Sequence, residues 1–124
     1  MLAVLTNGLV YISETDAEII PFNGDKASSV TADEILKQAG HEPDALVETV
    51  SAEAFFERLI AIKEWFGDSE KERAARFARL KEELAASLSD LTGFRIGKIR
   101  IDIYVVGIDA DGHLAGIKTK AVET

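Results

Sequence analysis

The sequence predicts an α+β fold in which helices pack on a mostly antiparallel sheet. The main observation is the stretch 94–124, where β-branched and polar residues alternate on both sides of Asp111-Gly112, as in a β-hairpin. Strand-like and helical runs alternate before this terminal hairpin, a combination that favours helices on a sheet. An apolar fraction of 47% in 124 residues suffices for a core and indicates a single domain over residues 1–124.

The alternation also predicts the register of the hairpin. A slip of one residue would turn every side chain to the opposite face of the sheet, so the apolar faces of the two strands must coincide. The predicted pairs are Ile101 with Ala121, Ile103 with Thr119, and Val105 with Ile117. This register places Asp102 near Lys120.

Turn residues divide the N-terminal part of the chain. The predicted elements are a helix at 2–5 ended at Asn7-Gly8, a strand at 9–12, a polar turn at 13–16, an edge strand at 18–22, and a turn at Asn23-Gly24. The strand at 18–22 is placed at an edge because Pro21 has no N–H to donate to a neighbouring strand.

Capping residues locate the next helix. Thr31 and Glu34 form a capping box for a helix over 32–39, which Gly40 ends. Residues 46–50 then predict a strand.

Two further helices are predicted in the second half of the chain. Ser51 caps a helix over 52–63 whose apolar face carries Phe55, Leu59 and Ile62. The longest helix starts at Asp68 or Ser69, extends to about Ser89, and is ended by Thr92-Gly93. Its apolar stripe consists of Phe77, Leu80, Leu84, Leu88 and Leu91.

Composition excludes several function classes. The net charge of −8 argues against direct binding of nucleic acid, which needs clustered Lys and Arg, and the acidic surface suits a partner with a basic groove. The chain has no cysteine, which fits a cytoplasmic location. We find no membrane-spanning segment, no phosphate-binding loop and no hydrolase motif. We therefore expect a protein that is not an enzyme, needs no cofactor and does not insert into membranes.

Two polar segments are better explained by structure than by chemistry. His41, just after a helix stop, is expected to make a structural hydrogen bond, because a lone histidine lacks partners for a metal site. The segment containing Asp109 and Asp111 faintly resembles a calcium loop. Counted from Asp109, Leu114 and Lys120 stand where a calcium-binding EF-hand loop needs Gly and Glu, so a plain turn is predicted.

Three residues lie outside the predicted core, and each has two interpretations. Glu14 follows an apolar run and is either solvated surface or a binding group. Trp65 lies at a junction between helices, where it is either buried or an exposed binding hot spot. Thr124 is either a frayed end or a presented carboxylate.

Several segments of the chain resemble the nuclease A inhibitor family, which comprises a cyanobacterial inhibitor of a sugar-non-specific nuclease and its inhibitor-like relatives. The similarity lies in "GLVYISE" (8–14), "QAGHEPDA" (38–45), Phe55-Phe56 with Arg58, Trp65, "ARFARL" (75–80), "IDIYVVG" (101–107) and "HLAGIKTKAVET" (113–124). The last two segments are the most specific.

The resemblance implies an α/β/α sandwich related to the plant pathogenesis-related protein 1 (PR-1) fold. It also implies an inhibitor of a sugar-non-specific, metal-dependent endonuclease of the ββα-metal type. By this resemblance Glu14 engages arginines of the nuclease and Trp65 contacts the enzyme. The carboxylate of Thr124 reaches the catalytic magnesium of the nuclease, so Thr124 is a metal ligand only in the complex.

The predicted partner-binding residues are Glu14, Lys63, Glu64, Trp65 and Thr124. Two features depart from the family. A full helix precedes "GLVYISE" in the family, whereas residues 1–7 precede it here. Lys63 stands where the family has a polar contact, and a cation that faces a basic groove is unfavourable. The alternative function, a non-catalytic interaction module on the same fold with a different partner, therefore stays open.

Overall fold

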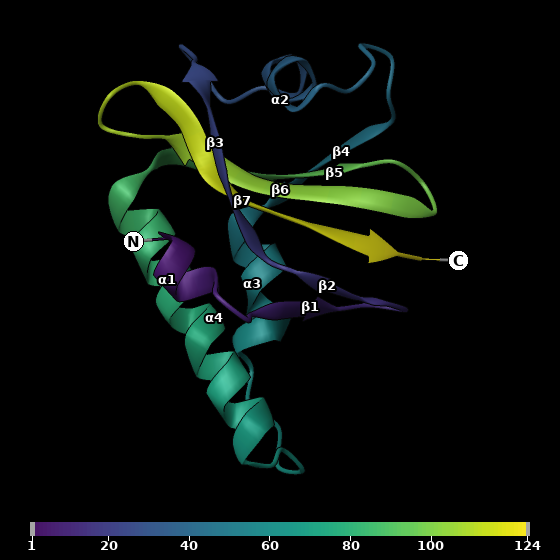
Figure 1. Ribbon diagram of the computed structural model, residues 1–124, viewed down its shortest axis with the longest axis vertical. Helices are drawn as coiled ribbons and strands as arrows, with labels where there is room; N and C mark the ends of the chain where they lie inside the picture. The colour runs from purple at the N-terminus through teal and green to yellow at the C-terminus, as the bar shows by residue number, and fades with distance from the viewer. Residues whose placement is uncertain (1, 124) are drawn as a thin grey trace.

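The computed structural model describes residues 2–123, which form four helices and seven strands (Figure 1). The helices are α1 (Leu2–Thr6), α2 (Ala32–Ala39), α3 (Ala52–Ile60) and α4 (Asp68–Ser87). The strands are β1 (Val10–Ile12), β2 (Asp16–Glu18), β3 (Ile20–Lys26), β4 (Val47–Ser51), β5 (Ser89–Ile96), β6 (Arg100–Ile108) and β7 (His113–Val122).

The strands form two antiparallel sheets. Five of them make the main sheet in the order β3-β7-β6-β5-β4, while β1 and β2 pair as a separate hairpin. Every strand pair in the described part of the chain is antiparallel. The predicted α+β class and antiparallel sheet are therefore confirmed.

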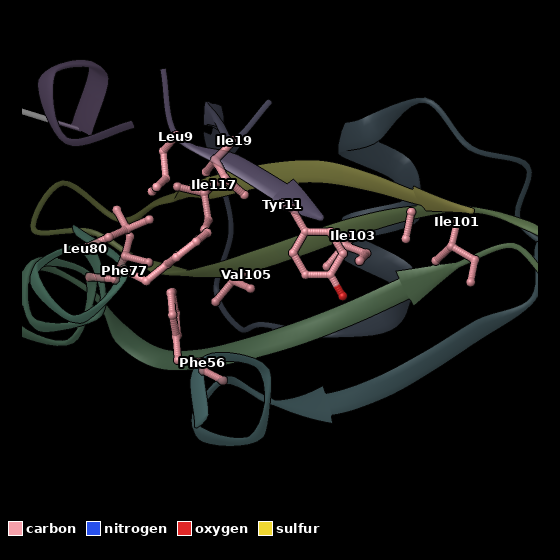
Figure 2. Packing of buried hydrophobic residues seen from close by; sticks show 13 residues of the cluster. Leu9, Tyr11, Ile19, Phe56, Phe77, Leu80, Ile101, Ile103, Val105 and Ile117 are labelled. Atoms are coloured by element: carbon pink, nitrogen blue, oxygen red, sulfur yellow. The ribbon is translucent and has the colours of Figure 1, made fainter. Parts of the chain in front are cut away.

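Helices cover both faces of the main sheet. Figure 1 shows α2 on one face and α1, α3 and α4 on the other. The rings of Phe56 and Phe77, from α3 and α4, point toward Val105 on β6 (Figure 2). On the opposite face, Ile35 and Leu36 of α2 belong to a second buried cluster. Two apolar cores thus hold the sheet between its helices.

The register of the β6–β7 hairpin is the predicted one. Ile101 pairs with Ala121, Ile103 with Thr119, and Val105 with Ile117. Asp102 lies opposite Lys120, also as predicted. The alternating pattern sufficed because one face of each strand is buried in the core that contains α3 and α4.

Helix α2 begins and ends at the predicted caps. The Thr31 hydroxyl accepts a hydrogen bond from the Glu34 N–H at 3.2 Å. Gly40 ends the helix in the left-handed conformation, with φ of 77°, which glycine adopts without a steric penalty.

The largest error in the sequence prediction is the missed strand β5. The sequence predicts a helix whose apolar stripe runs through Leu88 and Leu91 and which Thr92-Gly93 ends. The helix instead ends at Ser87, and Gly93 lies within β5 opposite Val50. A Cβ at position 93 would lie 2.7 Å from Val50 Cγ2, so this glycine permits close packing of two strands rather than a turn.

Smaller errors concern element boundaries. The predicted turn at Asn23-Gly24 is wrong, because both residues lie in β3, at a register shift in its pairing with β7. The Gln38 side chain supports this irregularity by accepting a hydrogen bond from the Asp25 N–H at 2.7 Å. Helix α3 ends at Ile60 rather than residue 63, and Ile62 is exposed instead of packed.

The predicted edge strand at 18–22 divides into two strands. Glu18 ends β2 and Ile20 begins β3, which does lie at an edge of the main sheet. The edge position of Pro21 is therefore confirmed.

Candidate functional site

Glu14 lies in the turn between β1 and β2, and its side chain is exposed. The turn is closed by Ser13, whose N–H and hydroxyl both donate to the Thr15 carbonyl, at 3.1 and 3.0 Å. Short strands on both sides of the turn present Glu14 at the tip of a hairpin, where a partner can reach its carboxylate.

The end of β7 lies beside this hairpin. The Val122 N–H donates to the Ser13 hydroxyl oxygen at 3.1 Å, and the Thr119 hydroxyl donates to the Glu18 carbonyl at 2.9 Å. These bonds join residues that are 109 and 101 positions apart in the sequence. They bring the last strand of the chain to the residue that precedes Glu14.

Thr124 lies outside the described residues, but the chain is described up to the residue before it. The Glu123 N–H donates to the Ile99 carbonyl at 2.9 Å. Figure 1 shows the tip of the β1–β2 hairpin and the end of β7 on the same side of the molecule. The structure thus brings together Glu14 and the segment that leads to Thr124.

Lys63, Glu64 and Trp65 lie in the loop between α3 and α4, and all three are exposed. The Phe66 N–H donates to the Lys63 carbonyl at 3.0 Å, which closes a tight turn. Trp65 is 75% exposed and meets the ring of Phe66 edge-on, with centroids 4.7 Å apart. Of the two interpretations of Trp65, the structure supports exposure.

The α3–α4 loop is set apart from the hairpin tip. It lies at the far end of α4 in Figure 1, whereas the hairpin extends to the side. A small pocket of about 100 Å³ lies between β1 and the loop, and its lining includes Ile12, Phe66 and the charged side chains of Arg58, Glu70 and Arg73. Ile12 is 50% exposed. The predicted residues therefore form two groups on a surface that is partly apolar between them, as protein-binding surfaces are.

Residues 1–124, the whole chain, match the family model described as nuclease A inhibitor-like protein. The chain belongs to the nuclease A inhibitor-like family. Membership supports a general role as a nuclease inhibitor, with a nuclease protein as its partner. A comparison with curated proteins gave no match. In the described residues, each helix is too short or too polar to cross a lipid bilayer.

The sequence of this inhibitor-like chain did not predict the residues that join the β1–β2 hairpin and the main sheet to the end of β7. The sequence predicts Ser13 only as part of a polar turn, whereas its side-chain oxygen accepts a hydrogen bond from the Val122 N–H of β7. Arg95, which pairs with Glu123 at 2.6 Å, lies on the missed strand β5. The pattern of residues around Ser13 and Arg95 gives no local signal of such distant contacts.

His41 makes the predicted structural hydrogen bond. Its Nε2 lies 3.2 Å from the Tyr104 hydroxyl and 3.3 Å from Asp102 Oδ2. These groups line a pocket of about 350 Å³ beside the end of α2. Burial raises the pKa of Tyr104 above its usual value of 10.0, and the negative charge of Asp102 raises it further.

Alkaline titration is expected to reveal this shift. Because folding raises the pKa of Tyr104, its contribution to stability is present below about pH 10 and is lost as pH rises through the folded pKa. Tyr104→Phe should remove a tyrosinate absorbance that appears above pH 10 in a titration of the unaltered protein. The variant should also show a smaller fall in the free energy of unfolding above pH 10. If the tyrosinate transition that is missing from Tyr104→Phe lies at or below pH 10, the assignment is contradicted.

The segment around Asp109 forms the predicted turn. Asp109 Oδ1 accepts hydrogen bonds from the N–H groups of Asp111 and His113, both at 2.9 Å. The bond from His113 is the main cause of a lowered pKa for the Asp109 carboxyl. Side-chain atoms of Asp109, Asp111 and His113 that could bind a metal ion lie within 4.8 Å of one another. The Asp109 carboxylate, however, already accepts the two backbone hydrogen bonds of the turn.

Proposed function

We propose that this protein inhibits a sugar-non-specific, metal-dependent endonuclease of the ββα-metal type by occupying its active site with two carboxylates. One is the side chain of Glu14 and the other is the C-terminal carboxylate of Thr124. The observation that carries the proposal is the bond from the Val122 N–H to the Ser13 hydroxyl oxygen. It joins the residue before Glu14 to the strand that leads to Thr124.

Each carboxylate has a suitable chemical role. Glu14 accepts paired, charge-assisted hydrogen bonds from an arginine of the nuclease, which then cannot bind a phosphate of the substrate. The α-carboxylate has a pKa of about 3.3–3.7 and is an anion at neutral pH. Magnesium prefers oxygen ligands, so this anion binds the catalytic ion in the complex. The inhibitor thereby imitates the charge of the substrate without offering a bond that can be cleaved.

Other parts of the proposal concern fold and location. Helices on both faces of the sheet support the relation to the PR-1 sandwich. The absence of cysteine supports a cytoplasmic location, where thiols stay reduced.

A titration of nuclease activity tests the proposal. A purified nuclease of this class is assayed on DNA and on RNA with increasing amounts of the protein, at fixed magnesium. We expect activity on both substrates to fall together, and excess magnesium not to restore it. Restoration by magnesium would indicate chelation by an acidic protein instead. A metal-independent ribonuclease serves as the specificity control, and full activity at a large excess of the protein would refute the proposal.

A different protein partner is the second candidate function. The observation that favours it is Lys63, an exposed cation on the α3–α4 loop, which a basic nuclease groove would repel. Failure to inhibit any nuclease of the class, together with specific binding of another protein at Glu14, would support this alternative.

Trp65→Ala is expected to raise the dissociation constant of the nuclease complex about tenfold or more, as truncation of an aromatic hot spot does. The melting temperature should hardly change, because Trp65 is 75% exposed. Lys63→Gln on the same loop is the companion variant, and it should tighten binding or leave it unchanged. Calorimetric titration gives the dissociation constant for the unaltered protein and for both variants. An unchanged dissociation constant for Trp65→Ala would contradict a contact between Trp65 and the nuclease.

A further inference from the structure

Arg95 holds two carboxylates from distant parts of the sheet. Its Nη2 lies 2.6 Å from Glu123 Oε2, and its Nε lies 3.4 Å from Glu48 Oε1. Glu48 is on β4, beside Arg95 on β5, whereas Glu123 follows β7 on the far side of β6. One guanidinium therefore ties the end of the chain to the opposite part of the sheet.

The pair between Arg95 and Glu123 differs from an ordinary surface ion pair. The Arg95 side chain is 19% exposed and the Glu123 side chain 49% exposed. Tyr11, Phe55 and Arg58 line the same pocket. The hydrogen bond to Glu123 is the largest cause of a raised pKa for Arg95. A short, partly shielded pair of this kind holds its geometry better than a solvated one.

The backbone next to this pair is also fixed. The Glu123 N–H donates to the Ile99 carbonyl at 2.9 Å, and the Val122 N–H donates to the Ser13 hydroxyl oxygen at 3.1 Å. Glu123 is thus held through its backbone and its side chain, although it lies beyond the last residue of β7. Thr124 is the next residue in the sequence.

We propose that Arg95 is a positioning residue for the C-terminal carboxylate. By holding Glu123, it sets the point and direction from which the chain end meets a partner. The inference rests on the proposed inhibitory function and names a residue that the partner need not touch.

Two physical effects make this positioning useful. Holding the chain end before binding removes part of the conformational entropy that the complex would otherwise lose. The pair also occupies the Glu123 carboxylate, which would otherwise lie next to the terminal carboxylate and compete with it for the same cation. Arg95 thereby favours a single carboxylate as the ligand.

A double-mutant cycle tests the inference. Arg95→Met and Glu123→Ala should each weaken inhibition about tenfold, and the double variant should be no weaker than either one, because both remove the same interaction. Lys81→Met is the matched control, since it breaks an equally short pair, Lys81–Glu53 at 2.6 Å. This control pair joins α4 to α3, and its loss should leave inhibition unchanged.

A second measurement does not need the nuclease. The NMR order parameter and hydrogen-exchange protection of the Glu123 amide should fall in Arg95→Met, while those of Tyr104 in the centre of β6 should not. If the unaltered protein fails to inhibit, the proposed function fails, and the Glu123 amide still tests the positioning. If the unaltered protein inhibits, and each single variant inhibits as strongly as the unaltered protein does, the inference is overturned.

Glu123→Ala keeps the inference testable if Arg95→Met is destabilised. Should Arg95→Met melt several degrees lower than the unaltered protein, Glu123→Ala decides alone, because Glu123 lies outside every strand. Full inhibition by that variant would refute a positioning role.

Discussion

Amidation of Thr124 is expected to abolish or strongly weaken inhibition. The change removes the terminal charge but keeps the threonine side chain. A C-terminal tag should act in the same way, because it puts a peptide bond where the carboxylate stood. Circular dichroism and the melting temperature should be nearly unchanged, since the pairing of β7 with β6 ends at Val122. Inhibition of a magnesium-dependent nuclease is measured for the amidated, tagged and unaltered proteins side by side.

An N-terminal tag is the control for this experiment. It extends the chain from α1, which lies on the opposite side of the molecule from the end of β7 (Figure 1), and should leave inhibition intact. A frayed end without a role predicts equal potency for both tagged forms. Equal potency would refute metal binding by the terminus, even for a protein that inhibits.

The second large effect is expected at Glu14. Glu14→Ala should weaken binding by about 2–5 kcal/mol, because it leaves an arginine of the nuclease unpaired in a buried interface. This loss corresponds to a rise in the dissociation constant of roughly 30-fold or more. The free energy of unfolding should hardly change, since the side chain is exposed at the tip of a turn.

Thr15→Ala is a matched control for Glu14→Ala. Thr15 is exposed in the same turn, and its backbone carbonyl, which accepts the bonds from Ser13, remains after the substitution. We expect the control variant to inhibit as the unaltered protein does. Equal inhibition by Glu14→Ala would exclude this residue as an anchor.

The parts of the fold that the sequence predicted are those with a strong local pattern. The β6–β7 register followed from alternation over nine and ten residues, which matches the face that packs against α3 and α4. Helix α2 followed from the capping box at Thr31 and the stop at Gly40. In both cases local preference and tertiary packing agree.

The errors arose where distant contacts override local preference. Gly93 suggests the end of a helix, but its lack of a side chain serves the close approach of β4. Asn23-Gly24 suggests a turn, yet pairing with β7 and the bond from Asp25 to Gln38 keep this segment in β3. Neither partner strand nor α2 can be placed from the residues around these positions.

The same limit applies to the candidate site. The exposure of Trp65 is one of two interpretations that the sequence leaves open, and the chemistry of the Glu14 carboxylate can be argued from the residue alone. The meeting of the hairpin with the chain end depends on Ser13 and Val122, which are 109 positions apart. The family resemblance indicated the residues, whereas the bond between the two segments emerged only from the structure.

The place of β7 has a consequence for synthesis of the protein. Strand β7 is made last, yet it lies between β3 and β6 and is the neighbour that joins β3 to the main sheet. A chain that ends early on the ribosome lacks both this strand and the anchor for the β1–β2 hairpin. A truncated product would therefore keep the pairing of β4, β5 and β6 but leave β3 and the β1–β2 hairpin without their neighbour in the sheet.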